Sequence, residues 1–231
     1  MTTTTPPTDD YQTRFARLAL SSQNPVVRGA AVERLGDQSL VLRVATSDPD
    51  PDVRYHAVQL IKDQEVLSHL ATTNHDAATR LAALQATDDQ DLLANVATRE
   101  EDPGVRREAV RHLTDQELLE RIAVSDPDPF VRETAVRRVV SQEVITRSAT
   151  SDLNPTVRRA ATQLVEDQSV LERVATADRD PDCRQAAEFA LSRRRAARLR
   201  SATSLMVDKR NCESINSPAS SLLSNSARKT L

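Results

Sequence analysis

Apolar residues along this chain recur in two short helical stripes, and the pair of stripes repeats every 26 residues. In the segment 102–127, Val105 and Ala109 share one helical face with their neighbours, because their spacings are three and four residues. Leu118 and Ile122 begin a second stripe in the same way. The apolar pattern of each unit therefore predicts a first helix of about three turns and a second helix of about two turns. The choice between α and 3₁₀ geometry stays open for the second helix.

Four columns of identical residues fix the register of the repeat. Each of seven units contains an arginine that is followed by an alanine three residues later; in the first six units a glutamine follows ten residues later and another alanine seventeen residues later, and Arg194 breaks the glutamine series in the last unit. The arginine column is Arg28, Arg54, Arg80, Arg106, Arg132, Arg158 and Arg184. Such a shared register over seven units indicates tandem structural repeats.

The same repeat also contains the sequence signals that start each helix. An Asp-Pro or Asn-Pro pair opens the first helix in six units, as at Asp102-Pro103, and Asp76-Ala77 alone lacks the proline. The side chain caps free N–H groups, and proline at the first helical position has no N–H to lose. Asp115 and its equivalents are N-cap residues for the second helix.

Helices this short need neighbours, since about 12–15 residues is already marginal for an isolated helix. Stacked units bury both stripes and form a solenoid. Residues 11–19 match the second half of a unit and predict a cap, and the last helix becomes arginine-rich after Leu191. We therefore expect a disordered N-terminus at 1–8, a repeat solenoid with caps at 9–200, and a disordered, basic, Ser-rich tail at 201–231.

The composition and charge of the chain disfavour several classes of function. Aromatic residues make up 2% of the chain and there are three glycines, which disfavours Gly-rich phosphate loops. Residues 1–191 carry 22 Lys and Arg against 32 Asp and Glu, whereas the remainder carries nine against two. An acidic body disfavours nucleic-acid binding outside the tail. Two cysteines suit a reducing compartment, and no signal peptide or membrane-spanning run is evident, so a cytoplasmic location is expected.

The motif Asp-Pro-x-Val-Arg-x-x-Ala-Val, found at 50–58 and 102–110, resembles HEAT-like repeats. It is most similar to short bacterial classes, namely the phycobilisome-lyase HEAT-like proteins and the leucine-rich-repeat variant proteins. The resemblance implies an all-α, right-handed α-solenoid of seven 26-residue two-helix repeats with an N-terminal half-repeat cap. It also implies that the second helices line the inner surface.

Departures from these relatives matter for chemistry. No cysteine precedes Cys183, so the iron–sulfur cluster of leucine-rich-repeat variant proteins does not carry over. No histidine is followed by Glu, unlike in the iron-binding HEAT-like hydroxylases, and no Trp is present, although HEAT-like DNA glycosylases use aromatic residues at the lesion. We expect no metal, no cofactor and no catalytic constellation.

Several residues are candidates for contacts, each with a structural alternative. The arginine column predicts an Asp–Arg ladder between units, or else an acid- or phosphate-binding ladder. The glutamine column predicts side-chain bonds to the backbone of the next unit. A more variable column on the second helix is the candidate partner surface: Arg17, Arg43, His69, Asn95, Arg121, Arg147 and Arg173. Acidic residues beside it favour local ion pairs as the alternative.

Two aromatic residues and the tail complete the candidates. Phe130 and Tyr55 are possible anchors of an interface, or scattered exposed aromatic residues. Basic residues at the C-terminal end could touch nucleic acid or anionic lipid: Arg193, Arg194, Arg195, Arg198 and Arg200. The sequence favours a non-catalytic scaffold or adaptor that binds a protein along the solenoid. A lyase-like or cofactor-handling protein is the alternative, and tail-mediated contact with nucleic acid or lipid is the third hypothesis.

Overall fold

The computed structural model describes residues 8–215, and this part of the chain is helical throughout, with no strand. The helices are α1 (Thr8–Ser21), α2 (Pro25–Val32), α3 (Gln38–Ser47), α4 (Pro51–Val58), α5 (Gln64–Thr73), α6 (Ala77–Ala86), α7 (Gln90–Arg99), α8 (Pro103–His112), α9 (Gln116–Ser125), α10 (Pro129–Val136), α11 (Gln142–Ser151), α12 (Pro155–Thr162), α13 (Gln168–Ala177) and α14 (Pro181–Ile215). They alternate as the first and second helices of a repeat of about 26 residues.

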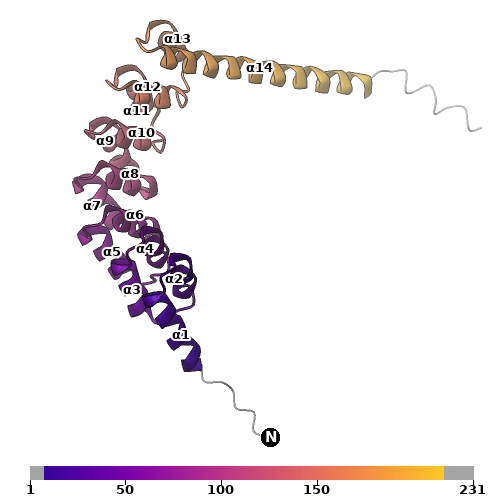
Figure 1. Ribbon diagram of the computed structural model, residues 1–231. Helices are drawn as coiled ribbons and strands as arrows, with labels where there is room; N and C mark the ends of the chain where they lie inside the picture. The colour runs from indigo at the N-terminus through magenta and orange to yellow at the C-terminus, as the bar shows by residue number, and fades with distance from the viewer. Residues whose placement is uncertain (1–7, 216–231) are drawn as a thin grey trace, which may run out of the picture. The chain divides into compact units, whose positions relative to one another are not determined.

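The chain divides into two compact units, residues 1–161 and residues 162–231. In the first unit, consecutive helices pack in pairs from α1 with α2 to α9 with α10, and the even-numbered helices from α2 to α10 also pack on one another in order. Figure 1 shows the even-numbered helices α2 to α10 along one side of the stack and the odd-numbered helices α1 to α9 along the other. The predicted all-helical repeat solenoid is confirmed by this arrangement.

Small side chains allow this close stacking. The two alanine columns lie in the core: Ala57, Ala83 and Ala109 on even-numbered helices and Ala45 and Ala71 on odd-numbered ones have no exposed surface. Leucine and valine fill the space between them, with Leu67, Leu93 and Leu119 fully buried at equivalent positions. A methyl group at each crossing lets helices approach to the short end of the usual 8–10 Å interaxial range.

Capping follows the sequence pattern, but helix lengths differ from the prediction. Asp50 accepts hydrogen bonds from the backbone N–H groups of Asp52 and Val53, and Pro51 opens α4. The first helices α2, α4, α10 and α12 span 8 residues, whereas the second helices from α3 to α13 span 10. The second helices are therefore α-helical and longer than the predicted two turns, because no helix breaker stands between the N-cap and the next Asx-Pro pair.

The 8-residue first helices end two residues earlier than α6 and α8, and the hydrogen bonds after α2 show why. After α2, the N–H groups of Arg34 and Leu35 bond the carbonyls of Ala31 and Val32, three residues back. These tighter turns bring Leu35 into the core, where it is 9% exposed. The last turn of the predicted first helix is thus present in 3₁₀-like form.

The second unit contains α13 and α14, which pack on one another. α14 runs for 35 residues to Ile215 and so includes the first part of the segment 201–231, for which disorder stays a prediction. Residues 192–215 contain no proline or glycine, and six of them are Arg, which favours the helix intrinsically. The rest of the predicted tail, residues 216–231, and residues 1–7 of the predicted disordered N-terminus lie outside the described residues. Within 8–215, no helix has the length and apolar character needed to cross a membrane.

Candidate functional site

The arginine column forms a regular ladder. Each of its seven arginines donates through Nη1 to the carbonyl oxygen six residues earlier, as Arg132 does to Asp126 at 2.8 Å. Arg28, Arg106 and Arg132 also bond both carboxylate oxygens of an aspartate in the following loop, namely Asp48, Asp126 and Asp152, at 2.8–3.0 Å. Each such arginine therefore ties its own loop to the next one.

Electrostatics in the ladder favour the charged forms. Burial opposes ionisation of Asp48, but hydrogen bonds from Arg28 and from the backbone N–H of Asp50 outweigh it and lower the Asp48 pKa. The hydrogen bond to Asp126 raises the pKa of Arg106, and the bond to Asp152 raises that of Arg132. These guanidinium groups are held by hydrogen bonds and ion pairs to neighbouring loops, and their geometry is that of a structural ladder.

The ladder is irregular in the middle of the first unit. Asn74 stands where the other units have Asp or Glu, and Arg54 instead bonds Asp76, at 3.0 Å. Asp76 then gives no side-chain cap to α6, unlike its equivalents Asp50 and Asp102. Arg80 reaches Glu100 at 3.3 Å, and its buried Nε has no hydrogen-bond partner.

The glutamine column clamps the loop of the next unit. Gln90 donates to the carbonyl oxygen of His112 and accepts from the backbone N–H and hydroxyl of Thr114. Gln116 bonds Arg138 and Val140 in the same way, and Gln12 of the cap bonds Arg34 and Gly36. These amides satisfy backbone groups at the ends of the first helices.

Once these columns are assigned to packing, a row of polar side chains remains exposed on the odd-numbered helices. We call it the odd-helix row: Arg43 on α3, His69 on α5, Asn95 on α7, Arg121 on α9 and Arg147 on α11. Arg17 on α1 and Arg173 on α13 hold the equivalent positions and are also exposed. Within the described residues, the side chains of Arg43, Arg121 and Arg147 make no hydrogen bond or ion pair.

A second row, of carboxylates, lies one turn closer to the helix N-termini. It consists of the exposed residues Glu65, Asp91, Glu117 and Glu143. Because residues at a spacing of four share a helix face, Glu117 and Arg121 lie on the same face of α9, as Glu143 and Arg147 do on α11. The odd-numbered helices therefore present parallel rows of both signs.

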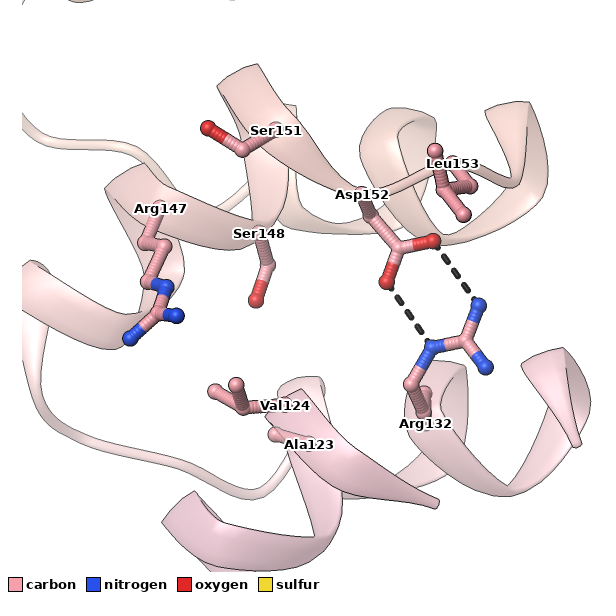
Figure 2. A pocket seen from close by; sticks show the side chains of 8 residues that line it. All are labelled: Ala123, Val124, Arg132, Arg147, Ser148, Ser151, Asp152 and Leu153. Atoms are coloured by element: carbon pink, nitrogen blue, oxygen red, sulfur yellow. Dashed lines mark hydrogen bonds and ion pairs between the residues drawn. The ribbon is translucent and has the colours of Figure 1, made fainter. Parts of the chain in front are cut away.

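A shallow groove lies between α9 and α11, and two arginines on it have different roles. Figure 2 shows Arg132 paired with Asp152, whereas Arg147 points away from that pair and has no partner. Val124 and Leu153 add apolar surface, and Leu153 is 95% exposed. The groove has a volume of about 300 Å³.

The same groove recurs four repeats earlier. Between α1 and α3, a groove of about 490 Å³ is lined by Leu20, Arg28, Arg43 and Asp48, which are equivalent to Val124, Arg132, Arg147 and Asp152. In both places a free arginine stands beside a ladder pair and an exposed aliphatic side chain. The repeat thus builds equivalent grooves on one side of the stack.

The even-numbered helices carry the two candidate aromatic residues. Tyr55 is half exposed and its hydroxyl donates to Gln85, so it links α4 to α6. Phe130, 52% exposed, lies in the first turn of α10 beside four arginines that the sequence reasoning missed: Arg107, Arg111, Arg137 and Arg138. The signal was present, because Arg111 and Arg137 hold the same repeat position on neighbouring first helices.

The C-terminal candidates belong to the second unit. Arg194 donates to the carbonyl oxygens of Val165 and Glu166, so it ties α14 to the loop before α13. The guanidinium of Arg193 lies 5.9 Å from the Phe189 ring centre. Arg195, Arg198 and Arg200 are exposed on α14. Arg194 is thus partly structural, while the other four present positive charge along one helix.

Ligands for a metal do not gather in the part of the chain that the structure describes. His56 bonds Glu33 and His112 bonds Glu108, but no group of three potential ligands forms among residues 8–215. Cys183 is fully buried at the valine position of the repeat. No family model, curated protein or solved structure matches the chain.

Proposed function

We propose that this protein is a non-catalytic scaffold of HEAT-like repeats that binds a segment of a partner protein along its odd-numbered helices. The observation that carries the proposal is the odd-helix row, in which Arg43, Arg121 and Arg147 are exposed and without partners inside the described chain. The recurrent arginines and glutamines of the other two columns, by contrast, bond neighbouring loops within the described chain, as Arg132 and Gln116 do.

The charge pattern indicates what kind of segment fits. A row of arginines and a parallel row of carboxylates favour a partner that carries both signs, and mixed charge disfavours a nucleic-acid backbone. Exposed Val124 and Leu153 beside the Arg147 groove offer apolar contact between the charges. An extended peptide with alternating charged and aliphatic side chains matches this surface.

Repeat spacing sets the spacing expected in the partner. Neighbouring helices pack at about 8–10 Å, and an extended chain advances about 3.3 Å per residue, so one repeat corresponds to about three partner residues. Acidic residues of the partner should therefore be about three residues apart opposite Arg121 and Arg147. His69 and Asn95 interrupt the row and would set the register, because no guanidinium stands there.

A charge-reversal experiment tests the proposal. Arg43→Glu/Arg147→Glu changes the row, and Arg14→Glu/Arg179→Glu changes two exposed arginines outside it by the same total charge. Both variants and the wild type are used as baits in lysate of the source cell, and recovered proteins are quantified by mass spectrometry. A discrete partner lost with the first variant and retained with the second supports the proposal. Equal recovery by all three baits, or recovery of nucleic acid or lipid alone, contradicts it.

A second arm tests the interruption of the row. His69→Arg/Asn95→Arg restores a continuous arginine row without touching the core, because both side chains are exposed. If these residues set the register, the purified partner binds this variant more weakly, whereas a partner held by positive charge alone binds it more tightly. Circular dichroism of each variant checks that the fold is retained.

A further inference from the structure

The even-numbered helices carry a groove of different chemistry from the odd-helix row. It lies between the neighbouring helices α8 and α10, has a volume of about 350 Å³, and is lined by four arginines and one aromatic ring. We call it the α8–α10 groove: Arg107, Arg111, Phe130, Glu133, Arg137 and Arg138. Its four arginines outnumber its one carboxylate, although residues 1–191 as a whole are acidic.

None of these residues belongs to a packing column of the repeat. At the repeat position of Phe130, other units have Asp52, Ala78 or Gly104. At the repeat position of Arg107, other units have Tyr55 or Leu81. Packing therefore does not require an aromatic ring or a guanidinium here. Arg107 and Arg111 lie on α8, Phe130 lies on α10, and Arg137 and Arg138 directly follow α10, whereas the grooves of the other face use columns that recur in several units.

Hydrogen bonding leaves the groove with unused donors. Arg107 makes no hydrogen bond or ion pair within residues 8–215, and its Nε is buried without a partner. A buried N–H without a partner costs free energy unless a ligand or water accepts from it. The Arg107 side chain therefore has no acceptor among residues 8–215 that would compete with a ligand in the groove.

The other three arginines of the groove make hydrogen bonds that fix their orientation but leave some of their N–H groups unbonded. Glu108, on the same helix, accepts from Nη1 of Arg111, and Glu133 accepts from Nε and Nη2 of Arg137. Arg138 donates one N–H to the carbonyl oxygen of Leu113. A guanidinium has five N–H groups, so each of these side chains retains donors while its orientation is fixed.

From this geometry we propose that the α8–α10 groove is a docking site for an acidic peptide segment of a partner protein. The carboxylates of the peptide bond the free N–H groups of Arg107, Arg111 and Arg137, and an apolar or aromatic peptide side chain packs on Phe130. Arginine matches the planar carboxylate with two parallel hydrogen bonds. Arginine and aromatic side chains in a desolvated groove are the usual energetic centres of peptide recognition.

A short acidic peptide fits better than a long polyanion. The groove volume lies at the low end of the range for ligand pockets, about 300–1,000 Å³, so it suits a few side chains. Asp102 and Asp128 cap the N-termini of α8 and α10, and Glu101 precedes Asp102 in the same loop, so carboxylates gather at this end of the two helices. They would repel a phosphate backbone that continued past the helix N-termini. The proposal does not depend on the use of the odd-helix row.

Peptide selection tests the site and does not require a purified partner. A displayed library of random linear peptides is selected on the full-length protein and counter-selected on Arg107→Met/Phe130→Ala. Arg107→Met keeps the apolar stem of the side chain and removes its charge. Surviving peptides should be rich in Asp and Glu and contain an apolar or aromatic residue.

Individual peptides then give the decisive affinities, measured by fluorescence anisotropy. Arg107→Met and Phe130→Ala should each weaken binding by about tenfold or more, as for central interface residues. Arg43→Met, which removes the same charge from the odd-numbered helices, should leave affinity unchanged. Circular dichroism and thermal unfolding check that each variant is folded. If Arg107→Met does not fold, Arg137→Met takes its place as the variant that removes a charge from the groove.

Three outcomes overturn the proposal. The first is a failure of the library to yield peptides that distinguish the wild type from the double variant. The second is an equal loss of affinity in Arg43→Met, which would show non-specific charge attraction. The third is tighter binding of a single-stranded oligonucleotide with the same dependence on Arg107, which would make the groove a nucleic-acid site. These results leave the odd-helix proposal untouched, because that proposal is tested by variants on the opposite side of the stack.

Discussion

The two arginines of the Figure 2 groove should respond very differently to the same substitution. Arg132→Met removes a guanidinium that is 12% exposed and bonds both oxygens of Asp152, itself 9% exposed, and the carbonyl of Asp126. Arg147→Met, on the other side of the groove, removes an exposed guanidinium with no partner among the described residues. Methionine keeps most of the apolar stem in both variants.

The expected cost follows from what each change leaves behind. Breaking a fully buried ion pair costs about 3–5 kcal/mol, and partial access of water to Arg132 and Asp152 reduces this to about 2 kcal/mol. The lost bond to the Asp126 carbonyl adds about 1 kcal/mol. We therefore expect Arg132→Met to lower the free energy of unfolding by about 3 kcal/mol, and Arg147→Met to change it by less than about 0.5 kcal/mol.

Urea unfolding followed by circular dichroism measures both values, and native-state hydrogen exchange places the loss in the solenoid. Stability in a stacked-repeat protein is nearly a sum of repeat and interface terms, so α9 to α12 should lose protection first. The companion variant Arg132→Met/Asp152→Asn should recover part of the loss, because it removes the unpaired carboxylate. Equal stabilities for Arg132→Met and Arg147→Met would refute the structural role of the ladder.

Three further predictions concern the packing columns. Asn74→Asp should raise the free energy of unfolding by about 0.5–1 kcal/mol in urea titrations, because it supplies Arg54 with the carboxylate found in other units; a loss of stability would count against the ladder. Gln90→Ala should cost about 1–2 kcal/mol by the same method, since it leaves backbone groups of the next loop unpaired, and an unchanged midpoint would contradict this. Because the pKa of Asp48 is lowered in the folded state, its stabilising contribution is present above its ordinary pKa of 3.8 and is lost as the pH falls through the lower folded value. Asp48→Asn should therefore unfold with a weaker pH dependence below about pH 4 than the wild type, and identical pH profiles would rule this out.

Much of this fold follows from the sequence because the packing residues repeat. Aligned arginine, alanine and glutamine columns can recur only if equivalent positions meet equivalent neighbours, and the caps at Asp50 and Asp102 follow from the Asx-Pro pairs. Helix ends were harder to predict. The extent of α14 depends on helix propensity after Leu191, a weak local term, and the short first helices depend on how Leu35 and its equivalents reach the core.

The surfaces were less predictable than the core. The odd-helix row could be listed from the repeat, but the absence of partners for Arg43 and Arg147 depends on side-chain positions that spacing alone does not give. In the α8–α10 groove, Phe130 was a candidate by itself, while Arg107 and Arg111 come from the preceding repeat and became visible as its neighbours only when the two helices were placed side by side. The effect of Asn74 in place of a ladder carboxylate likewise could not be predicted, because it depends on which other carboxylate Arg54 reaches in the folded chain.

Hydrogen–deuterium exchange on the protein with and without its recovered partner tests the central claim most directly. If the partner lies along the odd-helix row, exchange should slow in α3, α9 and α11 and remain unchanged in the even-numbered helices α2, α4 and α6. Protection confined to the even-numbered helices, or to residues 193–200 of α14, would contradict the claim and place the partner on another surface.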